Sequence, residues 1–344
     1  MGKLHKIKGV GKVSNISRRS FIKRTVAAGA ASGIILSGAN KIAGASESGS
    51  DKVGTLIDLT KCDGCKGQKV PACVSACKSK NESRFPEPVE NIQNYWPQKK
   101  HENWSDKRDL TKRLTPYNWT FVQNVKVDGK EISVPRRCMH CDNPPCVNLC
   151  PFSAMEQTSE GTTQVNPNVC FGGAKCRDVC PWEIPARQAG VGLYLKVAPK
   201  LAGGGVMYKC DLCYDRIKIG QNPACVEACP KGAISYGAKS ELKKAAYEKA
   251  KEINGYVYGD KENGGTATFY VSPVSFETIH EELEKQKASQ PNPEAPGFPT
   301  MPVQVGNFLD SANGMASALL LAPVATAFAA GITAYKTMKG KEEE

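Results

Sequence analysis

The stretch RCMHCDNPPCVNLCP at residues 137–151 places four cysteines at the spacing C-x2-C-x4-C-x3-C-P. Three further groups end in the same C-x3-C step, and two of these continue with proline. The four groups hold all fifteen cysteines of the chain: Cys62, Cys65, Cys73, Cys77; Cys138, Cys141, Cys146, Cys150; Cys170, Cys176, Cys180; and Cys210, Cys213, Cys225, Cys229. Such a recurrence indicates one kind of site that is built four times.

The spacing is typical of bacterial ferredoxins with inserts of variable length. In that pattern three closely spaced cysteines hold three corners of an iron–sulfur cubane, and the fourth, at the start of a helix, ligates a partner cluster. Groups therefore work in pairs, and four groups predict up to four clusters. We expect an α+β fold of two ferredoxin-like (4Fe–4S type) units with inserts, followed by a C-terminal transmembrane helix.

The third group lacks one cysteine of the regular C-x2-C-x2-C-x3-C-P spacing, and Gly173 stands at the missing position. Because glycine offers iron no side chain, we expect a 3Fe–4S cluster on Cys150, Cys170 and Cys176 and three 4Fe–4S clusters elsewhere. A 3Fe–4S cluster generally has a higher potential, which suits an electron acceptor. The alternatives are a fourth ligand from water or another side chain, or a change of register that uses Gly172 or Ala174.

Two other functions of so many cysteines are less consistent with the pattern. C-x2-C pairs also form structural zinc sites, but zinc ribbons do not need the C-x3-C-P step that recurs here. A disulfide framework would leave one thiol of the odd total unpaired. The chain lacks a convincing nucleophile–base or carboxylate-pair motif, which agrees with an electron carrier. A structural zinc protein and a self-sufficient soluble enzyme remain the alternatives from other classes.

The N-terminus predicts export in a folded state. Ser17-Arg18-Arg19-Ser20-Phe21-Ile22-Lys23 is a twin-arginine pattern, and an apolar run over 26–39 and small residues at 43–45 follow it. Residues 1–45 would then be the signal peptide, unless they are a basic tail before a chance apolar stretch. This route carries proteins folded in the cytosol, where thiols stay reduced and clusters can be assembled.

The net charge gives no support for nucleic-acid binding. Removal of residues 1–45, which hold nine Lys and Arg and no Asp or Glu, lowers the formal charge from +12 to +3. Each cluster with its thiolates adds roughly −2, so the loaded protein is mildly acidic.

The rest of the chain divides by composition. We expect the iron–sulfur domain at 46–290, with strands at 53–60 and 266–271, a helix at 239–253 and a cysteine-free insert at 78–132. Residues 291–307 contain repeated prolines and predict an extended linker.

The C-terminus predicts a membrane anchor. Residues 311–335 contain no charged residue, and this segment is long enough to span a bilayer, with a proline at position 323 that favours a kink. We place the anchor at 308–336 and, because lysines follow it, a cytoplasmic tail at 337–344 and the cysteine-rich body in the periplasm. The alternative is a buried helix of a soluble protein.

Two smaller features suggest supporting roles. His140 lies among cysteines that already complete their pattern, which favours a role beside the ligands or at the surface. Gly203-Gly204-Gly205 lacks the strand–glycine–helix context of a nucleotide loop and is interpreted as a flexible connection.

Residues 53–77 and 133–336 resemble the four-cluster iron–sulfur subunits of molybdopterin oxidoreductases of the dimethyl-sulfoxide-reductase type. The stretches that carry the resemblance are RCMHCDNPPCVNLCP, YKCDLCYDRIKIGQNPACVEACPKGAISYG, GGTATFYVSP and the C-terminal span. Together they are most similar to the beta subunit of membrane-bound formate dehydrogenase, and similar also to the iron–sulfur subunit of periplasmic uptake hydrogenases. Two departures are the seven residues between Cys65 and Cys73, where the family has two, and Lys78 in place of a proline.

The resemblance implies four ligand sets: Cys62, Cys65, Cys73 and Cys229; Cys77, Cys210, Cys213 and Cys225; Cys138, Cys141, Cys146 and Cys180; and Cys150, Cys170 and Cys176 around the three-iron cluster. It also implies partners. A catalytic subunit of the molybdopterin formate dehydrogenase or hydrogenase type would exchange electrons with this chain, and a membrane subunit with haem or a quinone site would complete the path.

Overall fold

The computed structural model describes residues 52–92, 94, 102–127, 129–197, 204–318, 320, 327 and 331. The chain divides into two compact units, Met1–Gly49 and Ser50–Glu344, and every described residue belongs to the second. The predicted signal peptide at 1–45 therefore lies outside the described residues.

A four-stranded sheet of order β8-β1-β10-β9 forms one part of this unit. Strand β1 (Val53–Asp58) runs parallel to β10 (Thr268–Ser272), with Thr55 opposite Thr268, and antiparallel to β8 (Ile234–Ala238). Strand β9 (Tyr256–Tyr258) pairs antiparallel with β10. The strands predicted at 53–60 and 266–271 are thus confirmed as β1 and β10.

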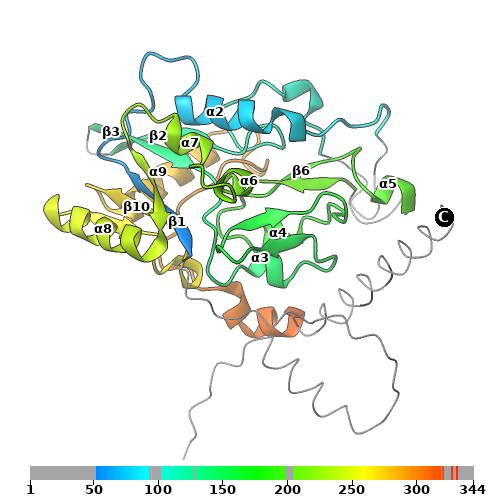
Figure 1. Cartoon of the computed structure of the whole chain (residues 1–344). Helices are drawn as coiled ribbons and strands as arrows, with labels where there is room; N and C mark the ends of the chain where they lie inside the picture. Colours follow the sequence, from blue (N-terminus) through cyan, green and yellow to red (C-terminus); the bar gives the residue numbers. More distant parts are fainter. Residues whose placement is uncertain are drawn as a thin grey trace, which may run out of the picture. The chain divides into compact units, whose positions relative to one another are not determined.

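Two amphipathic helices cover the sheet and its neighbourhood. Helix α8 (Lys239–Glu252) confirms the helix predicted at 239–253 and packs Leu242, Ala246 and Ala250 against β1 and β10 (Figure 1). Helix α9 (Phe276–Ala288) begins at Ser275, whose hydroxyl accepts a hydrogen bond from the Thr278 N–H.

The cysteine-rich part is built from short elements. They are the helices α2 (Ala72–Asn81), α3 (Pro145–Asn148), α4 (Lys175–Asp178), α5 (Tyr194–Val197), α6 (Tyr214–Ile217) and α7 (Ala224–Glu227), and the antiparallel pairs β2 (Phe121–Val127) with β3 (Lys130–Arg136), β4 (Met155–Gln157) with β5 (Thr163–Val165), and β6 (Ala186–Gln188) with β7 (Val206–Tyr208). Single 3₁₀ turns lie at Glu82–Arg84, Ser105–Lys107, Glu262–Gly264 and Phe308–Asp310. The result is a mixed arrangement of α and β structure (Figure 1).

The predicted insert at 78–132 is built into the main core. Helix α2 runs through residue 78 and strand β3 through residue 132. Trp119, Phe121 and Val125 are buried in the same cluster as residues of β1 and β10. The insert therefore forms part of the wall around the cysteines.

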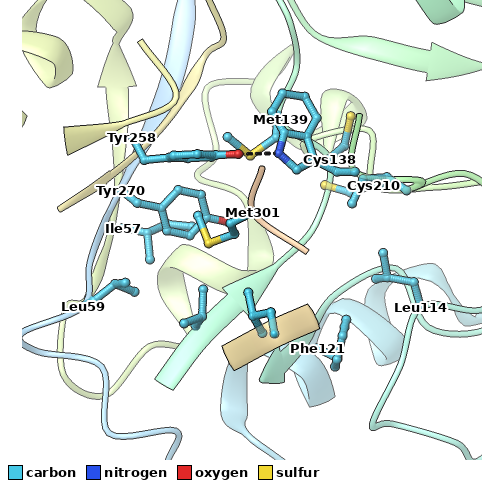
Figure 2. Packing of buried hydrophobic residues seen from close by; sticks show 14 of the residues in the cluster. Ile57, Leu59, Leu114, Phe121, Cys138, Met139, Cys210, Tyr258, Tyr270 and Met301 are labelled. Carbon is cyan, nitrogen blue, oxygen red and sulfur yellow. Dashed lines mark hydrogen bonds between the residues drawn. The ribbon is translucent and has the colours of Figure 1, made fainter. Parts of the chain in front are cut away.

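The proline-rich residues 291–307, predicted to be a linker, lie against the body. Met301 is fully buried, and Figure 2 shows its side chain among Ile57, Tyr258 and Tyr270. The Thr300 carbonyl accepts a hydrogen bond of 2.7 Å from Arg136, and the Pro302 carbonyl accepts one of 2.9 Å from the Tyr258 hydroxyl, so the backbone is fixed on either side of Met301. This segment consequently contributes to the core.

The predicted membrane anchor at 308–336 is described only at its start. Residues 312–318 are helical, and most of the positions that follow lie outside the described residues. Within the described part, none of the helices combines the length and the apolar character that crossing a bilayer requires.

Candidate iron–sulfur cluster sites

The first cavity is lined by four cysteines, which we name the Cys77 set: Cys77, Cys210, Cys213 and Cys225. Cys77 lies on α2 and Cys225 on α7, and these two helices pack against each other. Cys213 has a left-handed backbone with φ 54°, so the chain turns sharply just before α6. This turn brings the C-x2-C pair to the same cavity as the two helices.

A second cavity is lined by the Cys62 set: Cys62, Cys65, Cys73 and Cys229. The turn between the first two cysteines needs glycine, because Gly64 has φ +67° and a Cβ there would lie 2.8 Å from the Ser133 hydroxyl. The seven residues before Cys73 form a surface loop that ends at α2. The longer spacing therefore still delivers Cys73 to the cavity.

The other seven cysteines divide into the two sets that the resemblance implies, and their electrostatic interactions place the members of each set close together. The Cys138 set is Cys138, Cys141, Cys146 and Cys180; the Cys150 set is Cys150, Cys170 and Cys176. Burial and then the charges of the other three members raise the pKa of Cys141 well above its usual value. Burial and the charges of Cys170, Cys146, Cys150 and Cys180 do the same for Cys176, which therefore has neighbours in both sets. The grouping is the one that the resemblance implies; ligation of iron by these residues stays a prediction.

Electrostatic neighbours also give the order of the four sets. After burial, the largest influence on the pKa of Cys73 is the charge of Cys225, so the Cys62 set adjoins the Cys77 set. The charge of Cys138 raises the pKa of Cys210, and the two residues lie close together in Figure 2. Cys176 feels the charge of Cys146. The four sets therefore adjoin in the order Cys62 set, Cys77 set, Cys138 set and Cys150 set.

Several of the buried thiols do not ionise readily in the protein alone. Burial raises the pKa of Cys73 to about 12 and that of Cys210 to about 11. Within the described residues, no group of three or more His, Cys, Asp or Glu side chains is arranged to hold a metal ion directly. Thiolates in these sites need positive charge nearby, and iron and buried cations are two sources of it.

Two cations are buried beside these thiols. Arg137 lines the first cavity and donates one hydrogen bond, to the Thr55 hydroxyl, while its buried Nε and Nη1 have no partner in the described part of the chain. Lys209 is 5 % exposed, and its ammonium donates to two backbone carbonyls and one hydroxyl. A buried cation with unpaired donors is unfavourable unless an anion lies next to it. A cluster with its four thiolates is such an anion, so these residues fit the group that the cysteines imply.

His140 is buried rather than at the surface, at 1 % exposure. Its Nδ1 accepts a hydrogen bond of 3.0 Å from the Thr163 N–H, and its Nε2 lies 3.8 Å from the Cys210 sulfur. Burial, together with the charges of Lys209 and Arg137, holds the pKa of His140 well below its usual value. The ring is therefore neutral and contacts a predicted ligand without being one.

Gly173 has room for a side chain, and its neighbour Gly172 does not. A Cβ at Gly173 would meet no heavy atom within 4 Å, and its φ lies outside the left-handed region. Gly172 has φ +66°, and a Cβ there would lie 2.7 Å from the backbone of Gly205. Position 173 is therefore the one of the two at which a cysteine would fit.

Glu102, from the predicted insert, holds the loop of the third cysteine group. Its carboxylate accepts hydrogen bonds from Arg177 on α4 at 2.7 and 2.8 Å and from Arg187 on β6 at 2.8 Å. Arg187 donates in turn to the Gly172 carbonyl at 3.0 Å. Burial opposes ionisation of Glu102, but the two arginines outweigh it and lower the pKa of this carboxyl.

Some side chains that contact the cysteine sulfurs were not recognisable from the sequence. Asn263 donates to the Cys141 sulfur at 3.1 Å, and the Thr163 hydroxyl lies 3.5 Å from the Cys138 sulfur. Neither position has a distinctive sequence context. Arg137 and Lys209 did carry a signal, because each directly precedes the C-x2-C pair of its group.

Comparison with known proteins gives consistent relatives. Two family profiles match, both described as 4Fe-4S dicluster domain, over residues 61–154 and 130–239. The formate dehydrogenase-O iron-sulfur subunit of Escherichia coli K12 is 31 % identical over 232 residues, which cover 64 % of this chain and 67 % of that protein. The hydrogenase-2 operon protein HybA of Escherichia coli O157:H7 is 28 % identical over 303 residues, which cover 77 % of this chain and 83 % of that protein.

Proposed function

The chain belongs to the family of 4Fe–4S dicluster iron–sulfur subunits that includes those of formate dehydrogenases, and from this premise we propose that it relays electrons between a catalytic subunit and a membrane subunit through four clusters. Members of this family are electron-transfer subunits of oxidoreductase complexes. The proposed path begins at a molybdopterin formate dehydrogenase subunit and ends at a quinone or haem subunit in the membrane.

The observation that carries this proposal is the arrangement of the cysteines. Fifteen cysteines from four distant segments fall into four sets that adjoin in one order. Two of the sets each line a cavity, the first shared with Trp119 and Leu212 and the second with Val122 and Ile234. A linear series of such sites suits stepwise electron transfer.

The residues of the chain do three things in this mechanism. An iron–sulfur cluster, when bound, accepts and releases one electron at each set. The cysteines fix where each electron is held, and burial of the sets keeps water away from them. The buried cations and N–H donors beside the sulfurs favour the reduced, more negative state and so raise the potential.

We assign three 4Fe–4S clusters to the sets with four cysteines and a 3Fe–4S cluster to the Cys150 set. Gly173 supports this assignment, because it leaves the third group one thiolate short. The C-terminal segment supports a position near the membrane. Asn307 donates to the Asn143 carbonyl between Cys141 and Cys146, and Lys175, next to Cys176, lies over the ring of Phe308. A chain that continues into the membrane would thus leave the body beside the last two sets.

We also propose that the protein is exported by the twin-arginine pathway and is held on the periplasmic face of the inner membrane by residues 308–336. The twin-arginine pattern at 17–23 and the uncharged segment at 311–335 support this location.

Metal analysis of the purified mature protein tests the proposal. We expect a brown protein with about fifteen iron atoms and matching acid-labile sulfide. A colourless protein loaded with zinc would refute it. Identification of the subunits that co-purify from native membranes then tests the partner, and a molybdopterin subunit is expected.

A second partner is favoured by one observation. The similarity to the hydrogenase-2 protein HybA extends over 77 % of this chain, against 64 % for the formate dehydrogenase-O subunit. Co-purification with a hydrogenase large subunit, in place of a molybdopterin subunit, would assign the chain to a hydrogenase.

A further inference from the structure

Two of the three junctions between neighbouring sets share a construction. In the C-x3-C step the third and fourth cysteines lie one helical turn apart and belong to adjoining sets. Cys73 and Cys77 join the first two sets in this way on α2, and Cys146 and Cys150 join the last two at α3. The middle junction, between the Cys77 and Cys138 sets, has no C-x3-C step across it.

A chain of buried polar contacts lies at this middle junction. The Thr163 hydroxyl is 3.5 Å from the Cys138 sulfur, on one side of the junction. The Thr163 N–H donates to His140 Nδ1 at 3.0 Å. Because Nδ1 accepts, the proton of the neutral ring is on Nε2, which faces the Cys210 sulfur at 3.8 Å on the other side. Thr163 and His140 thus connect a cysteine of one set to a cysteine of the next.

Lys209 adds a positive charge at the same place. Its ammonium donates to the Thr163 carbonyl at 2.5 Å, to the Thr163 hydroxyl at 2.9 Å and to the Cys210 carbonyl at 3.0 Å. All three acceptors are neutral. The nearby Asp211 pairs with Arg84 at 2.7 Å. The charge of Lys209 is therefore available to the sulfurs on both sides.

We propose that His140, Thr163 and Lys209 form a bridge that raises the reduction potentials of the two central clusters and so allows electrons to cross the middle junction. This inference rests on the proposed function. In the crossing, one cluster loses one electron and its neighbour gains one, and no bond forms or breaks. Hydrogen bonds and positive charge at the sulfurs stabilise the reduced state of each cluster, so they keep the two potentials close enough for transfer in both directions.

The test is a redox titration of the purified holoprotein, followed by paramagnetic resonance, for two substitutions of one residue. In His140→Asn the short amide still accepts from the Thr163 N–H but does not reach Cys210, and asparagine tolerates the left-handed backbone at φ 51°. In His140→Gln the longer amide can donate near the position of Nε2. We expect His140→Asn to shift the reduction equilibrium of the Cys77-set cluster about tenfold toward the oxidised state, which is about 59 mV for one electron. We expect His140→Gln to restore most of this shift.

Lys209→Met and Thr163→Val keep the proposal testable if His140→Asn loses a cluster. Lys209→Met removes the charge and should lower the potentials of both central clusters. Thr163→Val removes only the hydroxyl and should lower mainly that of the Cys138 set. His280→Asn, on α9 away from the cysteines, serves as the control and should change no potential.

Iron content distinguishes failure of the proposed electron-transfer function from failure of the proposed bridge. Unmodified protein that is colourless and holds no iron or acid-labile sulfide would refute the proposed function itself. Full iron content with unchanged central potentials in the His140, Lys209 and Thr163 variants would overturn the bridge and leave the proposed function standing. Equal potentials in His140→Asn and His140→Gln, both below the unmodified value, would overturn the role of the Nε2 donor.

Discussion

Replacement of Gly173 by cysteine tests the proposed three-iron cluster most directly. The change would supply the one thiolate that the third group lacks. We expect the site to bind a fourth iron, to lose its three-iron character and to acquire a lower potential. Electron delivery from this cluster to the membrane subunit should then slow, because the last step becomes less favourable.

The structure indicates that the new side chain fits. No heavy atom lies within 4 Å of a Cβ at position 173, and the backbone is not left-handed. The steric term is therefore close to zero, and replacing glycine in the unfolded chain adds about 0.4–1 kcal/mol of stability. The same change at Gly172 would meet the backbone of Gly205 at 2.7 Å and place a side chain at φ +66°, which costs about 1–2 kcal/mol before the clash is counted. Disturbance of the loop is thus not the expected outcome of Gly173→Cys.

The assay combines iron analysis with paramagnetic resonance of the oxidised protein. Unmodified protein should show a nearly isotropic signal, because an oxidised 3Fe–4S cluster has an odd electron count and an oxidised 4Fe–4S cluster does not. Gly173→Cys should lose this signal, gain about one iron and lower the potential by on the order of 100 mV. Gly173→Ala adds the same Cβ without a thiol and should keep the signal.

Two results would refute this reasoning. The first is unmodified protein with four 4Fe–4S clusters and no oxidised-state signal, which would mean that another group ligates the fourth iron. The second is loss of the signal in Gly173→Ala as well as in Gly173→Cys, which would assign the effect to the loop and not to the thiolate.

Other predictions concern the body and the two termini. Met301→Ala should lower the free energy of unfolding by about 2–5 kcal/mol, measured by denaturant titration, and a loss below about 1 kcal/mol would contradict a core role for this segment. Glu102→Gln leaves two arginines without their carboxylate and should lower stability by about 2–4 kcal/mol, with loss of the three-iron signal on heating before the other clusters; unchanged melting would contradict this. Because the pKa of Glu102 is lowered in the folded state, this contribution is present above the ordinary carboxyl pKa and is lost as pH falls through the lowered one. Lysine at both Arg18 and Arg19 should leave the precursor in the cytoplasm with its clusters, and export at the normal rate would remove the support for the twin-arginine pathway. Deletion of 319–344 should release a cluster-bearing protein into the soluble periplasmic fraction, and retention in the membrane without partners would show another anchor.

The sequence was most informative where the physical requirement is local. The cysteine spacings are set by the turn that each cluster needs, so the four groups were recognisable without a structure, whereas their pairing was implied by the family resemblance. Strand β1 and helix α8 were also predictable, since a buried strand and an amphipathic helix follow from the order of apolar residues alone.

The parts that the sequence did not reveal depend on contacts between distant residues. Residues 121–136 form a hairpin in the core, although the part up to residue 132 was assigned to an insert, because their partners lie on α9 and in the main cluster. Met301 was assigned to a linker because prolines surround it, and its burial depends on β9 and β10. The supporting residues Thr163 and Asn263 are ordinary polar residues whose position against a sulfur is fixed only by the fold.

The exchange of cysteines between groups couples cluster binding to folding. The Cys62 set joins α2 to the far end of the cysteine-rich region, and the Cys138 set joins the second group to the third. Each site is therefore incomplete until both of its segments have reached their final positions. The free energy of binding then becomes free energy of folding, as in other metalloproteins whose ligands come from separate segments. A chain of this kind has to fold where iron, sulfide and reduced thiols are available together. Export after folding, which the twin-arginine pattern predicts, is the route that satisfies this condition.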